Sequence, residues 1–368
     1  MDISELLCGP AECLVEAAVD ADTTRPRPLP CDSFVARSAM QKAIRRGSKE
    51  IALRAAATVM LTNSAIVWRR LLVTALEDLG IHQIELLIRI AAAIERRRFG
   101  HHLKDEWPLI AQLVVECCEA NRCQAANDLH NLSLNSSDYD GFRSASANLL
   151  PRDLIAMASD PSRDLIERNI AIVTCLGADH APWSLQRTMV EPEAIIAAVG
   201  RNVNPAVRAI YAWAFRKSRL PLATSSLLLV SAEGGVEVKP CAFDDDVPEF
   251  TWVHGVPGFA FDQYTRGGRR VIADYVDVSD AWRLFGSKLH LSKSAEKAAA
   301  GELLFRVEGA VVSRRSSWDG ARVLSQLSRT VGCHLPKDAV EDGLRIVRSE
   351  LRVINQLRYS LPFDCSGH

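Results

Sequence analysis

The strongest constraint on the fold is a helical repeat that runs from residue 33 to residue 100. Apolar side chains recur there every three or four positions, which places them on one face of an α-helix. Asp32 or Ser33 can cap a helix that ends at Gly47, and Ser48 can cap a second helix that ends near 62–63. Two further helices are expected, over 65–80 and 81–100.

The same periodicity returns in most of the remaining chain, whereas strand signals are scarce. Helices are expected over 105–123, 161–177, 191–200, 204–218, 294–312, 317–332 and 338–360. The Ser-, Asn- and Asp-rich stretch 131–152 is typical of a loop. We therefore predict an all-α protein in which antiparallel helical hairpins form a collar-like or solenoid-like domain, with a smaller helical domain at the C-terminus.

Breaks in composition divide the chain into four parts. Residues 1–32 form an N-terminal segment with a proline-rich linker, and 33–230 form the larger helical domain. Gly, Pro and acidic residues cluster in 231–257, which we interpret as the boundary before a C-terminal helical domain over 258–368. Within the boundary, "GGVEVKPCAF" (234–243) is suited to the edge of a short hairpin.

The overall charge is nearly balanced, with 44 Lys and Arg against 45 Asp and Glu. Any nucleic-acid site must therefore be a local patch rather than a property of the whole surface. No apolar run approaches the length of a membrane helix, and the N-terminus lacks the basic region of a secretory signal. The ten cysteines are expected to be reduced thiols in apolar surroundings. We expect a cytoplasmic protein without a membrane partner.

No pattern for a metal or a catalytic nucleophile is present. Cys118, Cys123 and His130 are spaced too widely for the paired ligands that structural zinc prefers. The sequence contains no HExxH and no G-x-S-x-G, and lacks the Gly-rich Lys-containing loop that holds nucleotide phosphates. We expect neither a metal nor a cofactor.

One stretch, 38–81, carries ordered features that a known family shares. The matching positions are Ser38, Ala39, Lys42, Arg45, Gly47, Ala52, Arg69, Arg70, Leu71, Glu77, Asp78 and Gly80. Over about residues 33–95 the chain resembles the C-terminal helical region of the replication-associated recombination protein A (MgsA) family of clamp-loader-like AAA+ ATPases. It departs from that family at "LRAA" (53–56), where the family has Tyr-Trp, and in lacking the ATPase module.

The resemblance implies a collar-like helical domain that acts in DNA replication or repair, self-associates and hydrolyses no ATP. The cations that would contact DNA are Lys42, Arg45, Arg46, Arg69, Arg70, Arg96, Arg97 and Arg98. A structural interpretation is also open, because cations in the last turn of a helix complement its dipole by about 0.3 to 1 kcal/mol. Glu77 and Asp78 are expected to form a salt bridge between helices.

The least ordinary stretch is "HGVPGFAFDQYTRGGRRVIADY" (254–275). If it is helical from 258 onward, Phe261, Tyr264 and Gly268 share a stripe, and Asp262 can pair with Arg266 four positions later. Its adjacent glycines would cost roughly 2 kcal/mol inside a helix, which requires a compensating role. That role is either close packing or a polar cluster that binds an anion or a partner. The cluster would comprise His254, Asp262, Tyr264, Arg266, Arg269 and Arg270.

Three functions remain open. The first is a non-enzymatic, self-associating protein that acts with DNA and with replication or repair proteins. The second is a helical adaptor for a protein partner. The third is an enzyme that uses the 254–270 cluster on a phosphate-containing substrate.

Overall fold

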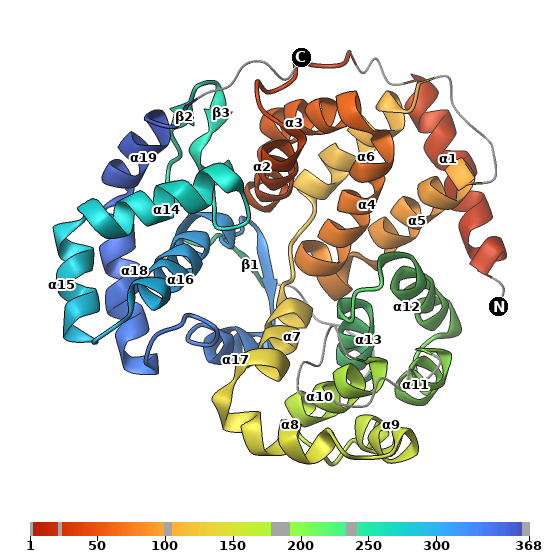
Figure 1. The fold of residues 1–368 in the computed structure, drawn as a ribbon. Coiled ribbons are helices and arrows are strands. Elements are labelled where there is room, and N and C mark those ends of the chain that lie inside the picture. The colour runs from red at the N-terminus through yellow and green to blue at the C-terminus, as the bar shows by residue number, and fades with distance from the viewer. Residues whose placement is uncertain (1–2, 21–23, 99–104, 178–191, 233–240, 363–368) are drawn as a thin grey trace.

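The computed structural model describes residues 3–20, 24–98, 105–177, 192–232 and 241–362. Helices dominate these residues and no sheet exceeds two strands, so the predicted all-α class is confirmed. Figure 1 shows the N-terminal and middle helices on one side of the molecule and the C-terminal helices on the other.

The N-terminal group comprises α1 (Ile3–Asp20), α2 (Ser33–Arg46), α3 (Lys49–Thr62), α4 (Ser64–Thr74), the π-helical turn η1 (Ala75–Leu79), the 3-10 turn η2 (Gly80–Gln83), α5 (Ile84–Arg98) and α6 (Trp107–Glu119). Capping explains the predicted boundaries of α2, whereas the Ser48 side chain makes no capping hydrogen bond to α3. The Asp32 carboxylate accepts from the first amides of α2, and Gly47 ends that helix at a φ of 70°. The predicted helix ends at 47 and 62 are confirmed.

The middle group comprises α7 (Ala125–Asn135), η3 (Ser137–Tyr139), α8 (Asp140–Ser146), α9 (Pro151–Ser159), α10 (Leu165–Leu176), α11 (Pro192–Val199), α12 (Pro205–Ser218) and α13 (Leu222–Ala232). The predicted loop at 131–152 is wrong, because α7, η3 and α8 occupy most of it. Arg143 stabilises this turn by donating to the carbonyls of Ser133 and Ser136 at the end of α7.

The C-terminal group comprises β1 (Cys241–Phe243), β2 (Trp252–Val253), β3 (Val256–Pro257), η4 (Gly258–Ala260), α14 (Arg266–Val278), α15 (Asp280–Lys288), α16 (Lys293–Leu304), the π-helical turn η5 (Phe305–Gly309), β4 (Arg315–Ser317), α17 (Asp319–Ser328), η6 (Lys337–Ala339), α18 (Val340–Ser349) and α19 (Leu351–Tyr359). β2 and β3 form a hairpin, whereas β1 pairs antiparallel with the distant β4. The predicted hairpin at 234–243 falls mostly outside the described residues.

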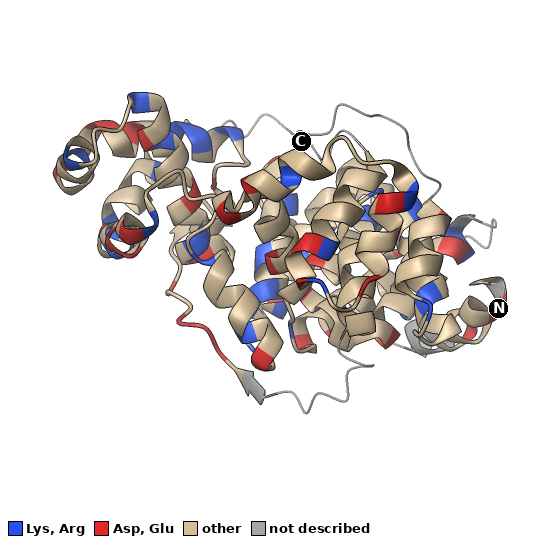
Figure 2. Cartoon of the chain, turned by 90° about the horizontal axis from the view of Figure 1, so that it is seen from below, with Lys and Arg blue, Asp and Glu red and all other residues tan. Residues whose placement is uncertain are grey.

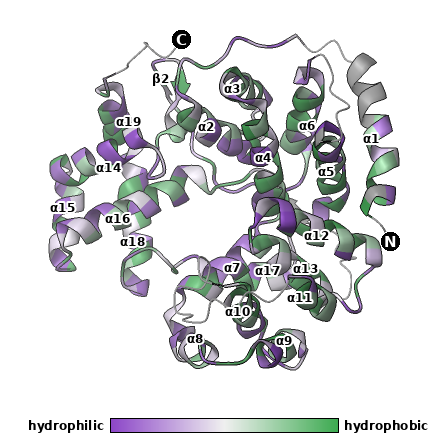
Figure 3. Ribbon diagram, turned by 45° about the vertical axis from the view of Figure 1, so that its right-hand side comes forward, coloured by the Kyte–Doolittle hydropathy of each residue, from purple (hydrophilic) through white to green (hydrophobic). Residues whose placement is uncertain are grey.

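The buried apolar side chains form two cores. The first unites α2–α13 with residues 253–261 and with Trp318–Val331 around α17, and the second lies among α14–α16, α18 and α19. Figure 3 shows the hydrophobic residues concentrated on helix sides that face other helices. The chain therefore enters the second core after Phe261, returns to the first at Trp318, and leaves it again after Val331.

The stretch 254–275 is a hairpin turn and a loop before it is a helix. His254 and Gly255 both have positive φ, at 49° and 81°, as a tight turn between β2 and β3 requires. Thr265 caps α14 by accepting from the Gly268 amide, so the helix predicted from 258 begins only at Arg266. Its predicted stripe is correct from Gly268 to Tyr275, but Phe261 lies outside the helix and Tyr264 is exposed.

Gly268 is required by close packing. A Cβ atom there would lie 1.9 Å from the carbonyl oxygen of Asp262, an approach that no side chain tolerates. The glycine thus lets the 262–265 loop lie directly on the first turn of α14. This close packing is one of the two roles expected for the glycine pair.

We expect Gly268→Ala to lower the free energy of unfolding by about 1 to 3 kcal/mol, because the new methyl group must displace backbone. Gly141→Ala is the matched control. It lies on the exposed side of α8 with nothing within 4 Å of a Cβ, so it should stabilise by about 0.5 to 1 kcal/mol. Urea unfolding of both variants measures the difference, and equal stabilities would contradict the packing argument.

Candidate functional site

A polar cavity of about 790 Å³ lies between the two cores. We call it the central cavity. Its walls come from α2, α7, η1, the 262–265 loop, α16 and η5, so segments far apart in the sequence meet there. The charged side chains that line it are Arg37, Lys42, Arg45, Arg70, Glu77, Asp128, Asp262, Glu302 and Arg306, with His130 and His334.

Two π-helical turns border the central cavity. η1 carries Glu77, and η5 carries Phe305. A π-helical turn inserts one extra residue into a helix and is often found at functional sites. Its wider turn alters which side chains a helix directs toward a given neighbour. These two turns flank α2, whose buried face supplies Lys42 and Arg45 to the cavity.

Lys42 and Asp262 form a buried ion pair at the cavity wall. Their side chains are only 4% and 5% exposed, and the Lys42 ammonium group also donates to Ser38 Oγ at 2.6 Å. The second carboxylate oxygen of Asp262 accepts from the Tyr264 amide at 3.0 Å. This pair joins α2 to the stretch that begins at His254.

A second buried network lies beside the first. Asp78 is fully buried, and its carboxylate accepts from Arg45 Nε at 2.6 Å and from Gln41 Nε2 at 2.9 Å. Gln41 also donates to Glu77 and accepts from Arg70. The expected salt bridge of Asp78 between helices is therefore confirmed, with Arg45 as its partner.

Burial affects the protonation equilibria of several of these groups, among them Lys42 and Glu77. It lowers the pKa of Lys42 to about 8, although the attraction of Asp262 opposes the shift. The pKa of Glu77 is raised by burial and then by the neighbouring charge of Asp78. Both shifts follow from removing charge from water, and both occur at the cavity wall.

Asp128 on α7 lines the central cavity and two smaller cavities beside it, of about 570 and 300 Å³. Burial raises its pKa to about 6, against the attraction of Arg315. Its carboxyl group therefore gains or loses a proton near neutral pH, where an ordinary aspartate is fully ionised.

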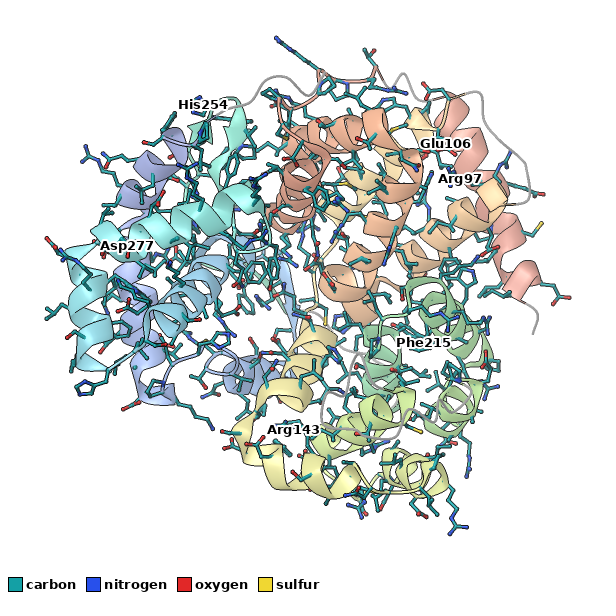
Figure 4. The ribbon with its side chains drawn as sticks, in the orientation of Figure 1. Arg97, Glu106, Arg143, Phe215, His254 and Asp277 are labelled. Atoms are coloured by element: carbon teal, nitrogen blue, oxygen red, sulfur yellow. The ribbon has the colours of Figure 1, made fainter. Side chains whose placement is uncertain are left out.

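Most of the eight cations expected at a DNA surface have partners inside the protein. Lys42 and Arg45 are buried in the networks above, and Arg46 donates to the carbonyls of Pro248 and Glu308. Arg97 pairs with Glu106, as Figure 4 shows, and Arg96 is half-buried. Arg69 is exposed, Arg70 lines the central cavity, and the side chain of Arg98 lies outside the described residues.

The structure separates the six residues expected as one polar cluster. Asp262 and Tyr264 line the central cavity, whereas His254 lies at the hairpin turn, where Nε2 is 2.9 Å from the carbonyl of Tyr359. Figure 4 places His254 at the periphery of the molecule. Asp262 pairs with Lys42 rather than with Arg266, so the expected ion pair along α14 is wrong. Arg266, Arg269 and Arg270 are exposed at the start of that helix.

Sequence reasoning missed several residues that the fold brings to the cavity. Phe34 and Arg37 lie on the first turns of α2, and the Arg37 guanidinium stacks 4.0 Å from the centre of the Phe34 ring. Asn127, Asn131 and Asn135 line the opposite part from α7. Only the four-residue spacing of Asn127, Asn131 and Asn135 signals a shared face.

The described residues hold no group of three His, Cys, Asp or Glu side chains placed to bind a metal. Within the same residues, none of the helices combines the length and apolarity needed to cross a bilayer. Figure 2 shows acidic and basic residues interspersed over the described helices, in keeping with the balanced composition.

No protein-family model, curated protein or solved structure matches the chain. Function must therefore be argued from the geometry of the central cavity and its surroundings.

We expect Lys42→Met to lower the free energy of unfolding by about 3 kcal/mol or more, because it leaves the Asp262 carboxylate buried without its cation. The double variant Lys42→Met/Asp262→Asn should lose clearly less than the sum of the two single variants. Chemical denaturation of all four proteins gives the coupling energy. Additive losses would show that the two side chains do not interact.

The raised pKa of Asp128 predicts a pH-dependent stability. Between about pH 4 and pH 6 the folded protein retains a proton that the unfolded chain has lost, so the stabilising contribution of Asp128 is lost as the pH rises through that window. The side chain of Asp128→Asn stays neutral, so the stability of that variant does not show this decline with pH. Thermal unfolding from pH 4 to pH 8 should show the wild type declining relative to the variant up to about pH 6, and a pH-independent difference would be contrary evidence.

Proposed function

We propose that the protein is a non-enzymatic helical protein that binds single-stranded nucleic acid in DNA replication or repair. The contact surface comprises Phe34, Arg37 and Tyr264, which line the central cavity, and Arg266, Arg269 and Arg270, which follow the cavity-lining Thr265 at the start of α14. We call these six residues the rim. The rim differs from the set of cations that the sequence predicts at a DNA surface, because cations of that set such as Lys42 and Arg45 are buried in ion pairs.

The observation that carries the proposal is the N-terminal end of α14, residues 266–270. Arg266, Arg269 and Arg270 are all exposed there, and none has a carboxylate within 4.0 Å among the described residues. Cations at a helix N-terminus oppose the helix dipole, so these arginines do not stabilise the helix that carries them. Arg269 donates to the carbonyl of Gln263 at 3.4 Å, and an external anion would supply the acidic partner that all three arginines lack.

Exposed aromatic rings accompany the arginines. Phe34 is 69% exposed and Tyr264 is 65% exposed, although both side chains are large and mainly apolar. Aromatic rings on which bases stack, beside cations that follow the phosphates, are the usual elements of single-strand binding. The resemblance of residues 33–95 to a replication-associated family supports the same function. It also implies self-association, which light scattering of the purified protein would measure.

We expect Arg266→Glu/Arg269→Glu/Arg270→Glu to weaken binding of a labelled single strand at least tenfold. Its salt dependence should also fall, by roughly 0.7 in the log–log slope for each phosphate contact removed. Fluorescence anisotropy across a salt series measures both effects. Glutamates in the first turn of a helix favour the dipole, so the variant should remain folded.

Arg152→Glu/Arg163→Glu/Arg201→Glu is the matched control, because it changes the net charge equally at exposed sites away from the rim. It should bind nearly as well as the wild type. If the two triple variants lose the same affinity, binding follows total charge and the rim is not the site. A wild type that binds no nucleic acid at low salt would refute the proposed function itself.

A further inference from the structure

We propose that the central cavity takes one nucleotide unit, a base with its sugar and a single phosphate. This inference deepens the proposed function, and it rests on that function only in that the rim would lead a strand to the cavity. The unit has two sources of the same chemistry, a free mononucleotide or the terminal nucleotide of a strand.

The volume and charge of the cavity suit one such unit. About 790 Å³ lies within the range of small-ligand sites, which is roughly 300 to 1,000 Å³. Five cations and four carboxylates line it, and most are paired, as Arg306 is with Glu302 at 3.0 Å. A run of several phosphates would face these carboxylates without enough cations. A single phosphate would find enough cations in the cavity.

Two arginines mark the position of the phosphate. Arg37 on α2 and Arg70 on α4 both line the cavity, and neither has a carboxylate within 4.0 Å among the residues that the structure describes. Burial lowers the pKa of Arg70, the carboxylates of Glu77 and Asp78 oppose that shift, and the nearby charges of Arg37 and Arg45 add to it. Each guanidinium uses only part of its five N–H donors within the protein, and a phosphate would accept from the others.

Aromatic and amide side chains provide for the base. Tyr264 and Phe305 form an edge-to-face pair with centres 5.4 Å apart at the cavity wall. The exposed ring of Tyr264 is a stacking surface for a base. Asn127, Asn131 and Asn135 on α7 offer both donors and acceptors, as the edges of a base require.

The first arm of the test uses the wild-type protein. Calorimetry with deoxyadenosine monophosphate and with deoxyadenosine measures whether a nucleotide binds and whether it needs its phosphate. Anisotropy competition then compares a linear single strand with a circular strand of the same length and sequence, since only the linear strand has an end. We expect the monophosphate to bind at least tenfold more tightly than the nucleoside.

The second arm fills the cavity. Asn127→Trp places a large side chain on the α7 wall, and Ala145→Trp makes an equivalent change at an exposed position on α8. The first variant should lose at least tenfold in affinity for the monophosphate, and the second should not. If the monophosphate does not bind the wild type, or binds Asn127→Trp as well as the wild type, the inference is wrong.

The competition data identify the source of the unit. A linear strand that competes better than the circular strand, and loses that advantage in Asn127→Trp, shows that the cavity takes a strand end. Equal competition together with tight monophosphate binding supports the inference with a free nucleotide as the ligand. Strand binding that depends on the rim, without monophosphate binding, overturns the inference and leaves the proposed function intact. Monophosphate binding without any strand binding supports the inference and overturns the proposed function.

Discussion

Buried charged side chains on α2 link the two cores. Gln41, Lys42 and Arg45 lie on the buried face of α2, where desolvation of an unpaired charge would cost several kcal/mol. That cost is offset only if Asp262, Asp78 and the carbonyl of Gly309 arrive in the right positions. Because those partners come from separate parts of the chain, α2 braces one core against the other, and the same constraint fixes the walls of the central cavity.

Interactions between residues close in sequence explain what could be predicted from the sequence. Both ends of α2 are set by neighbouring residues, the start by the Asp32 carboxylate and the end by the left-handed backbone of Gly47, so they can be found without the fold. The prediction failed at 131–152, where polar composition suggested a loop. There Arg143, a buried side chain from α8, satisfies carbonyls at the end of α7, and composition carries no trace of that contact.

The site was predictable only in pieces. Lys42 and Asp262 were each singled out, but 220 positions separate them, and no local pattern says that they meet. The sequence predicts that Lys42 and Arg45 contact DNA, whereas both are buried with acidic partners, which is rare for charged residues. The sequence did mark the arginines of α14. Their isolation from carboxylates depends on what packs nearby and appears only in three dimensions.

The pairing of β1 with β4 and the return of α17 to the first core have a consequence for how the protein comes apart. The second core is assembled from two lengths of chain, and the length between them belongs to the first core. A chain shortened before α17 would therefore lose part of both cores, and no one cut releases either core whole. We therefore expect the two cores to unfold together, so that damage to one is transmitted to the other.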